Sequence, residues 1–271
     1  MYQIENYISQ FQDKTISVCV YDLETNQEIN IHADVLMHPA STMKVPVMME
    51  VFRQAHEGKF SLDDKIEIYN SFKSIIDGSE FHLDVVDDSE KSLYARLGDK
   101  ETVRELNRLM IVLSSNLATN ILMDKVGTKP IDDFIKALGI KDVNVMRLIE
   151  DKQAYRLNIN NSFSARGTTS MMRLIAEGKV VSKQASDEMI QVMLGQEFNE
   201  SIPALLPKDV KVAHKTGWTG EFFHDTGIVF PSNRKPYAIT LFTNGFPEDD
   251  ESQAHNCMAE ISKLVYIHLT N

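Results

Sequence analysis

The chain has 271 residues, 43% of them hydrophobic, which is enough to bury a sizeable core in one compact unit or in two packed lobes. Its formal charge of −11 and the lack of a basic cluster argue against nucleic acid and anionic membranes as partners. Small molecules are therefore the expected ligands. No stretch approaches the length of an apolar membrane span.

The N-terminal segment, Met1 to Lys14, lacks both the cationic start and the apolar core of a secretory signal. A chain that begins at Met1 is therefore expected in the cytoplasm. An extracytoplasmic location is expected only if a signal peptide has been removed. Residues 15–32 follow as two predicted strands joined by a turn centred on Asn26.

Ser41 opens the next predicted element, a helix over residues 41–57. Apolar residues follow it at helical spacing: Met43, Val47, Met48, Val51 and Phe52. Lys44 lies three residues after Ser41 and would share its helix face, so a neutral Lys44 amine could take the serine's proton. Burial and a second cation nearby, such as Lys215, would favour that neutral form. The alternative is a serine N-cap beside a solvated lysine.

The middle of the chain is mainly helical. The acidic segment 63–99 has weak periodicity and is expected to be a long excursion near the rim of the site. Helical patterns then cover residues 101–113, 117–125, 131–138, 165–176 and 186–194. Ser114-Ser115-Asn116 stands between the first two patterns, where Ser114 could relay a proton and Asn116 could hold a substrate amide. Alternatively, both could satisfy backbone groups around a helix break.

Strands return near the C-terminus, over residues 210–214, 226–230 and 237–243, before a closing helix at 251–269. The first of them leads into Lys215-Thr216-Gly217. Lys215 would attract a carboxylate, Thr216 would offer a hydroxyl, and Gly217 would let a ligand approach the backbone. The N–H of Trp218 is a candidate oxyanion donor. The alternative is an ordinary turn.

Strands at both ends with helices between them predict an α+β fold, with one sheet built from both termini and an inserted all-helical lobe. The expected sheet lobe comprises residues 1–57 and 206–271, and the expected helical lobe comprises residues 58–205.

Other candidate sites are weaker. A second Ser-x-x-Lys, Ser232 to Lys235, lies between two prolines and is expected to be a hairpin loop. The eight histidines are scattered, and His214 and His224 are expected to be hairpin or core residues. Cys19 and Cys257 are expected to be buried free thiols. We expect no metal and no cofactor.

Ser41-Thr42-Met43-Lys44, Ser114-Ser115-Asn116 and Lys215-Thr216-Gly217, in this order, resemble the motifs of the penicillin-recognising serine enzymes, most closely the class A β-lactamase-like branch. The resemblance implies an antiparallel sheet with helices packed on it, an active site in the cleft between the lobes, and a β-lactam or related amide or ester as substrate. We expect a monomer. The implied roles are Ser41 as nucleophile, Lys44 as acylation base, Ser114 as proton relay, Asn116 as substrate anchor, Lys215 and Thr216 as carboxylate site, and the N–H groups of Ser41 and Trp218 as oxyanion donors.

The chain departs from this family at two positions. Ser115 stands where the family usually has Asp. The family's water-activating Glu lies two residues after an Arg, but Ile149 has that spacing from Arg147, and Glu150 comes one residue later. Glu150 is therefore the candidate deacylating base, and the alternative is a solvated loop carboxylate. A D-Ala peptidase or esterase with the same site, or a penicillin-binding sensor acylated once, stays open as an alternative function.

Overall fold

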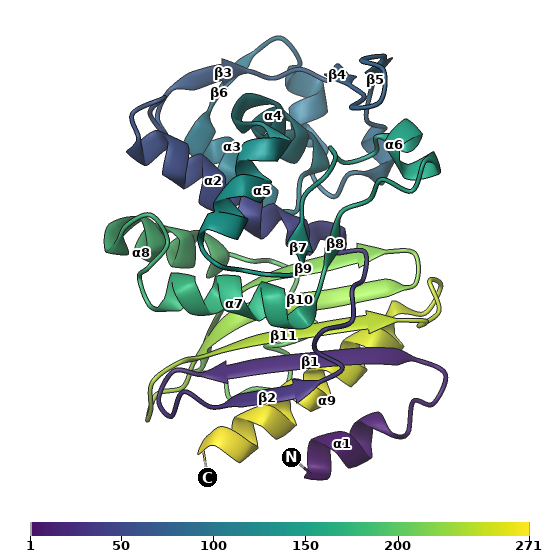
Figure 1. Ribbon diagram of the computed structural model, residues 1–271, viewed down its shortest axis with the longest axis vertical. Coiled ribbons are helices and arrows are strands. Elements are labelled where there is room, and N and C mark those ends of the chain that lie inside the picture. Colours follow the sequence, from purple (N-terminus) through teal and green to yellow (C-terminus); the bar gives the residue numbers. More distant parts are fainter. Residues whose placement is uncertain (1, 271) are drawn as a thin grey trace. The chain divides into compact units, whose positions relative to one another are not determined.

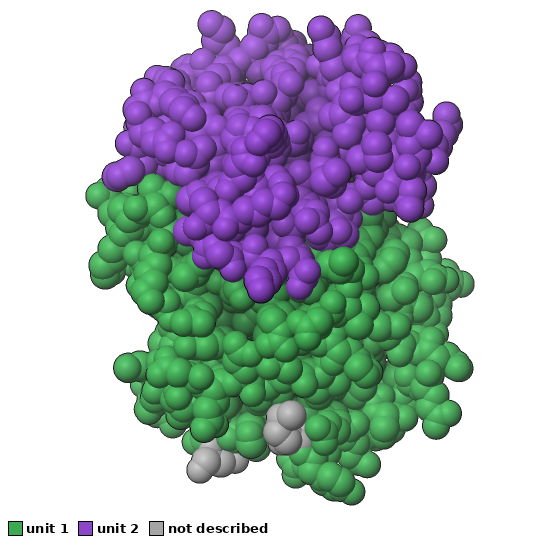
Figure 2. All heavy atoms as spheres, in the orientation of Figure 1, with its two compact units in different colours: residues 1–42, 163–271 green, residues 43–162 purple. Residues whose placement is uncertain are grey.

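The computed structural model describes residues 2–270 and divides into two compact units. Unit 1 comprises residues 1–42 and 163–271, and unit 2 comprises residues 43–162 (Figure 2). The lobe boundaries expected from the sequence lie elsewhere, after residue 57 and before residue 206. Met1, on which the expected location depends, lies outside the described residues.

Unit 1 contains a five-stranded sheet in the order β2-β1-β11-β10-β9, with every neighbouring pair antiparallel. The strands are β1 (Thr15–Asp22), β2 (Glu28–Ile31), β9 (Lys211–Thr219), β10 (Phe222–Phe230) and β11 (Tyr237–Asn244). Because β1 pairs with β11, with Val18 opposite Leu241, the two ends of the chain share one sheet. This confirms the α+β fold class predicted from the sequence.

Helices cover both faces of this sheet (Figure 1). Helices α7 (Ala165–Ala176) and α8 (Lys183–Met193) lie on one face, and α1 (Tyr2–Ile8) and α9 (Glu251–Thr270) lie on the other. The closing helix, α9, buries apolar residues at helical spacing against the sheet: Ala254, Cys257, Met258, Ile261 and Val265. Helix α1 was not predicted, because its short polar sequence has little periodicity.

The strands alternate between the two helical layers. In β1, Val18 and Val20 join the core cluster that contains the α9 residues. Cys19 points the other way, and its backbone carbonyl accepts the Thr169 hydroxyl of α7 at 3.2 Å. Cys19 and Cys257 are both free and buried, as predicted, and burial raises the pKa of the Cys19 thiol to about 11.

Unit 2 is mainly helical. Its helices are α2 (Lys44–His56), α3 (Val103–Val112), α4 (Asn116–Val126), α5 (Thr128–Ala137) and α6 (Lys152–Arg156). Helix α2 contacts α3, α4 and α5, and every residue from Lys44 to Phe52 is buried. A helix that is apolar nearly all round in this way forms the centre of a helical unit. Helix α6 was not predicted.

The excursion over residues 63–99 consists of short elements, as the weak periodicity indicated. It contains β3 (Lys65–Glu67), β4 (Phe72–Lys73), β5 (Glu80–Phe81), and the 3-10 helices η2 (Val85–Asp87) and η3 (Ser92–Arg96). Strand β3 pairs with β6 (Lys100–Thr102), and β4 pairs with β5. A two-stranded ladder also joins β7 (Val143–Asn144) and β8 (Ser162–Phe163). Within residues 2–270, no helix is long and apolar enough to cross a membrane.

We expect Gly227→Ala to destabilise unit 1. Gly227 in β10 pairs with His214 in β9, and an added Cβ would lie 2.7 Å from the His214 Cβ and 2.8 Å from the Ala213 carbonyl oxygen. The backbone must shift to relieve this overlap, which should lower the free energy of unfolding by about 1–3 kcal/mol. Urea denaturation followed by circular dichroism measures the change. Thr219→Ala, at an exposed position of β9, is the control and should stay within about 0.5 kcal/mol of the parent.

Candidate active site

Ser41 lies in a tight helical turn, the 3-10 helix η1 (Ala40–Met43), which runs directly into α2. The preceding Ala40 has a positive φ of 46°. Thr42 closes the turn, because its N–H and its hydroxyl both donate to the Pro39 carbonyl, at 3.1 and 2.6 Å. Ser41 is partly exposed, whereas Thr42 is buried. The helix predicted from Ser41 is therefore present, but its first turn is a 3-10 turn and the α-helix begins at Lys44.

Strand β9 approaches this turn at Gly217. A Cβ at position 217 would lie 2.9 Å from the Ser41 backbone nitrogen and 3.0 Å from that of Thr42. Only glycine permits so close a contact between a strand and a helical turn. The contact brings Gly217, the last residue of the Lys-Thr-Gly motif, to the backbone of Ser41. Trp218 follows, with about half of its side chain exposed (53%).

Lys215 and Thr216 lie on the same strand. Lys215 is buried, and its Nζ donates to the Thr216 carbonyl oxygen at 2.9 Å. Thr216 is partly exposed. The predicted strand is confirmed and extends through the whole motif to Thr219, so the motif belongs to a sheet and not to a turn.

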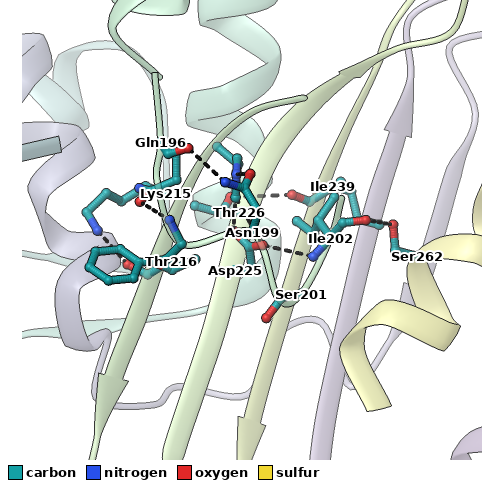
Figure 3. Close-up of polar contacts among 12 residues, drawn as sticks. Gln196, Asn199, Ser201, Ile202, Lys215, Thr216, Asp225, Thr226, Ile239 and Ser262 are labelled. Atoms are coloured by element: carbon teal, nitrogen blue, oxygen red, sulfur yellow. Dashed lines mark hydrogen bonds and ion pairs between the residues drawn. The ribbon is translucent and has the colours of Figure 1, made fainter. Parts of the chain in front are cut away.

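Polar contacts hold this part of β9 in place (Figure 3). His214, next to Lys215, places Nδ1 2.9 Å from an Asp225 carboxylate oxygen and Nε2 3.2 Å from the Asn199 side-chain oxygen. Asp225 also accepts the Ile202 N–H at 3.0 Å. His214 is buried, so it is a core residue, which is one of the two positions that the sequence predicted for it. These bonds tie β9, β10 and the segment that precedes β9 together.

His224 is also a core residue. Its Nδ1 lies 2.7 Å from its neighbour's backbone oxygen, that of Phe223, and its Nε2 lies 2.8 Å from the His38 carbonyl oxygen. Burial lowers the pKa of His224 to about 4, so the ring is neutral at pH 7. Among residues 2–270, no group of three or more His, Cys, Asp and Glu could hold a metal ion.

Lys44 is the central charged residue of unit 2. Its Nζ donates to the Ser114 carbonyl oxygen at 2.7 Å, to the Ser114 hydroxyl at 3.1 Å and to the Asn116 side-chain oxygen at 2.8 Å. Lys44 is fully buried, and burial lowers its pKa to about 7, although the charge of Asp88 opposes this shift. A substantial fraction of the amine is therefore neutral at pH 7 and able to accept a proton.

Ser114 and Ser115 form a break between α3 and α4, at the place where the sequence separated two helical patterns. Ser114 has a positive φ of 57°, a conformation that costs a non-glycine residue about 1 kcal/mol or more. The Ser115 hydroxyl accepts the Ala118 N–H at 3.2 Å and so caps α4. The break turns the Ser114 hydroxyl and carbonyl toward Lys44.

Asp88 is a residue of this site that the sequence analysis missed. Its carboxylate accepts the N–H groups of Asn116 and Leu117, at 3.0 and 2.9 Å. Asp88 is buried, 28 residues before Asn116 in an acidic segment without periodicity. Asp88 differs from most acidic residues of this segment because it is buried. The sequence alone does not show which of these acidic residues are buried.

Glu150 lies in a loop whose backbone is held from α4. The Asn120 side chain bonds the Ile149 backbone at both groups, accepting its N–H and donating to its carbonyl, each at 2.9 Å. Glu150 has a positive φ of 60° and is half-buried. Burial, with a smaller contribution from the charge of Asp87, raises the pKa of its carboxyl group. Asp151 is a structural residue, since it accepts bonds from Ser74, Ile75 and Ala154.

The candidate residues thus form one set in each unit. In unit 1, Ser41 meets Gly217, and Lys215, Thr216 and Trp218 continue along β9. In unit 2, Lys44 binds both Ser114 and Asn116. Sequence spacing related only Lys44 to Ser41, and the grouping of the three motifs was an expectation from the family resemblance. The sequence did not predict the strained backbone at Ser114.

Comparison with known proteins gives the same assignment as the motifs. The model of the beta-lactamase enzyme family matches residues 1–269. β-Lactamase BRO-1 of Moraxella catarrhalis is 24% identical over 248 residues, which is 89% of this chain and 76% of that protein. β-Lactamase Toho-1 of Escherichia coli is 24% identical over 261 residues, 92% of this chain and 82% of that protein.

Two solved structures extend the likeness to the fold. TLA-3 extended-spectrum β-lactamase superposes with a TM-score of 0.85 at 22% identity and covers 100% of this chain and 99% of its own. A leucine-to-glutamate variant of PBP-A, solved as an acyl-enzyme complex with penicillin G, gives a TM-score of 0.85 at 22% identity and covers 99% of this chain and 95% of its own. The chain therefore belongs to the beta-lactamase enzyme family, and its family and fold support a serine β-lactamase function.

Proposed function

We propose that this protein is a class A-like serine hydrolase that opens β-lactams through an acyl-enzyme on Ser41. The observation that carries the proposal is the buried Lys44 amine, with a pKa of about 7 and hydrogen bonds to Ser114 and Asn116. A lysine with that pKa is half neutral near pH 7 and can act as a base. Lys44 lies only three residues after Ser41 in one helical segment.

In the proposed acylation, neutral Lys44 takes the proton from the Ser41 hydroxyl. The Ser41 oxygen bonds to the lactam carbonyl carbon, and the carbonyl oxygen becomes an oxyanion that the N–H groups of Ser41 and Trp218 stabilise. The carbon–nitrogen bond then breaks as Ser114 passes its proton to the leaving nitrogen and takes a proton from the Lys44 ammonium, to which it is hydrogen-bonded at 3.1 Å. The contact of Gly217 with the Ser41 backbone supports this placement of the oxyanion donors.

The remaining residues bind the substrate. Lys215 and Thr216 would hold the substrate carboxylate, since one offers a cation and the other a partly exposed hydroxyl. Asn116 would hold the substrate amide. Its side-chain oxygen accepts from Lys44, and its side-chain nitrogen donates to the Asp87 carbonyl at 3.2 Å, so its orientation is well defined.

For deacylation we propose Glu150 as the base that takes a proton from the attacking water. The water oxygen bonds to the ester carbonyl carbon, the carbon–oxygen bond to Ser41 breaks, and the leaving Ser41 oxygen takes up the proton that Glu150 accepted from water, so both residues return to their starting states. The raised pKa of Glu150 suits a general base, and Asn120 holds the backbone of the residue before it. We also propose that the protein works as a monomer on small β-lactams, either in the cytoplasm or outside it. Cell fractionation distinguishes the two locations.

A penicillin-binding role without turnover is the second candidate, and Ile149 favours it. This residue has the spacing from Arg147 at which the family's water-activating glutamate is expected, and its side chain cannot accept a proton. The penicillin G acyl-enzyme of PBP-A was obtained with glutamate in place of a leucine. A D-Ala peptidase or esterase would use the same site and differ only in substrate.

We expect Ser41→Ala to abolish covalent modification, because the variant lacks the attacking oxygen. Intact-protein mass spectrometry after incubation with a chromogenic cephalosporin measures the adduct. The matched control is Ser232→Ala, which removes the serine of the second Ser-x-x-Lys sequence and should leave adduct formation unchanged. An adduct of undiminished yield on Ser41→Ala would disprove the nucleophile assignment.

The rate of acylation should depend on the protonation state of Lys44. Below pH 7 the amine is increasingly protonated, so kcat/KM should fall about tenfold per pH unit, with a plateau at higher pH. Stopped-flow measurement of acylation between pH 5 and 9 gives the profile. Lys44→Arg keeps the positive charge but cannot act as a base, and it should lose at least about 100-fold in rate. A flat profile would contradict Lys44 as the base.

Glu150→Gln should slow deacylation about 10²–10⁴-fold and leave the acylation burst intact, because a carboxamide cannot take the proton of water. Burst and steady-state phases of cephalosporin hydrolysis, with the lifetime of the acyl-enzyme mass, measure both steps. The paired variant Ile149→Glu should speed deacylation if the neighbouring position is the one that reaches the water. If Glu150→Gln deacylates at the parent rate, Glu150 is not the base. A parent that shows only one stoichiometric burst would favour the penicillin-binding role.

A further inference from the structure

Asp88 binds the first turn of α4 with both carboxylate oxygens. Oδ1 accepts the Asn116 N–H at 3.0 Å, and Oδ2 accepts the Leu117 N–H at 2.9 Å. The Tyr94 hydroxyl also donates to Oδ2, at 3.0 Å, and only 3% of Asp88 is exposed. A carboxylate that is bound at both oxygens and buried in this way has one orientation.

This contact supplies what the helix itself lacks. The first N–H groups of an α-helix have no partner within the helix. The Ser115 hydroxyl, the cap of α4, satisfies only the Ala118 N–H. Asp88 satisfies the two N–H groups at the very start of the helix, one of which belongs to Asn116.

The segment around Asp88 holds Asn116 at a second point. The Asn116 side-chain nitrogen donates to the carbonyl oxygen of Asp87, the neighbour of Asp88, at 3.2 Å. Its side-chain oxygen is thereby left facing Lys44, from which it accepts at 2.8 Å. Residues 87 and 88 therefore fix both the backbone and the side chain of Asn116.

We propose that Asp88 is a positioning residue for acylation, which orients Asn116 toward substrate and Lys44 and supplies the fixed negative charge of the Ser114–Asn116 motif. The inference deepens the proposed function and rests on it. Ser115, the middle residue of the motif, carries no charge. The negative charge comes from Asp88, which lies 28 residues before Asn116 in the sequence and binds its N–H. Asp88 does not touch substrate and acts through Asn116 and Lys44.

The charge of Asp88 also affects the base. Burial lowers the pKa of Lys44 to about 7, and Asp88 acts in the opposite direction. Tyr94 and Glu150 also interact with Asp88, and burial together with nearby carboxylates raises the pKa of both. Without the Asp88 charge, burial would act on Lys44 with less opposition, and its pKa would fall further below 7.

The test is Asp88→Asn, which keeps the size of the side chain and removes the charge. One amide oxygen can accept only part of what two carboxylate oxygens accepted, so Asn116 should move, and kcat/KM for acylation by a chromogenic cephalosporin should fall about 10–100-fold. The acid limb of the pH profile should shift to lower pH by roughly one unit. A purely structural role for Asp88 would lower the rate without moving that limb.

Two variants control this test. Asp84→Asn removes a carboxylate from the same segment; Asp84 is exposed and caps η2 through the Val86 N–H at 3.0 Å. It should leave both the rate and the acid limb unchanged. Asp88→Glu keeps the charge but moves it by one methylene, so it should restore the limb while the rate stays low. If Asp88→Asn fails to fold, as judged by circular dichroism, Asp88→Ser, which also removes the charge, replaces it and should show the same shift of the acid limb.

Two measurements without substrate separate this inference from the proposed function. The first is the titration of Lys44 by NMR of protein labelled with carbon-13 at the lysine ε-carbons, assigned with Lys44→Arg. The second is hydrogen exchange of the Asn116 and Leu117 amides. In Asp88→Asn the Lys44 pKa should fall and both amides should exchange at least about tenfold faster. Parent values for both would overturn the role of Asp88, whereas a parent that no β-lactam acylates would overturn the proposed function.

Discussion

The burial of one ammonium group is the constraint on which unit 2 depends. Lys44 begins α2, the central helix of the unit, and its Nζ has no exposure to water. An amine in that position needs acceptors, and it obtains them from Ser114 and Asn116. The positive φ at Ser114 turns its carbonyl oxygen toward the Lys44 amine. The helix break between α3 and α4 thereby supplies the buried amine with an acceptor.

A different constraint shapes unit 1, where a strand must pass a helical turn at backbone distance. Gly217 in β9 makes this possible beside Ser41. Gly227 in β10 makes a similarly close approach possible beside His214 of β9. Strand β10 and helix α8 pack against β9, and the buried contacts of Asp225 tie the preceding segment to it. A nucleophile on a turn thereby gains a fixed backbone neighbour that could stabilise an oxyanion.

Two polar residues of unit 2, Ser115 and Asp88, bind different N–H groups in the first turn of α4, which contains Asn116. Ser115 caps the helix through Ala118, and Asp88 binds the two preceding amides. The same carboxylate opposes the effect of burial on Lys44, so backbone geometry and base strength are linked through one residue. Burial raises the pKa of Glu150, and the charges of Asp87 and Asp88 add to this shift, so Asp88 acts electrostatically on both the proposed acylation base and the proposed deacylation base.

The sequence by itself determined the three motifs, the strands at both termini and most of the helices, because apolar periodicity and motif spacing are local properties. It also predicted the helix start at Ser41 and the strand that carries Lys215. Only the tertiary structure decided the strained break at Ser114, the burial of Lys44 and the pairing of Asp88 with α4. These depend on contacts between residues far apart in the chain. A carboxylate in an acidic loop has the same local sequence whether it is solvated or buried, and only folding brings it to the amides that it binds.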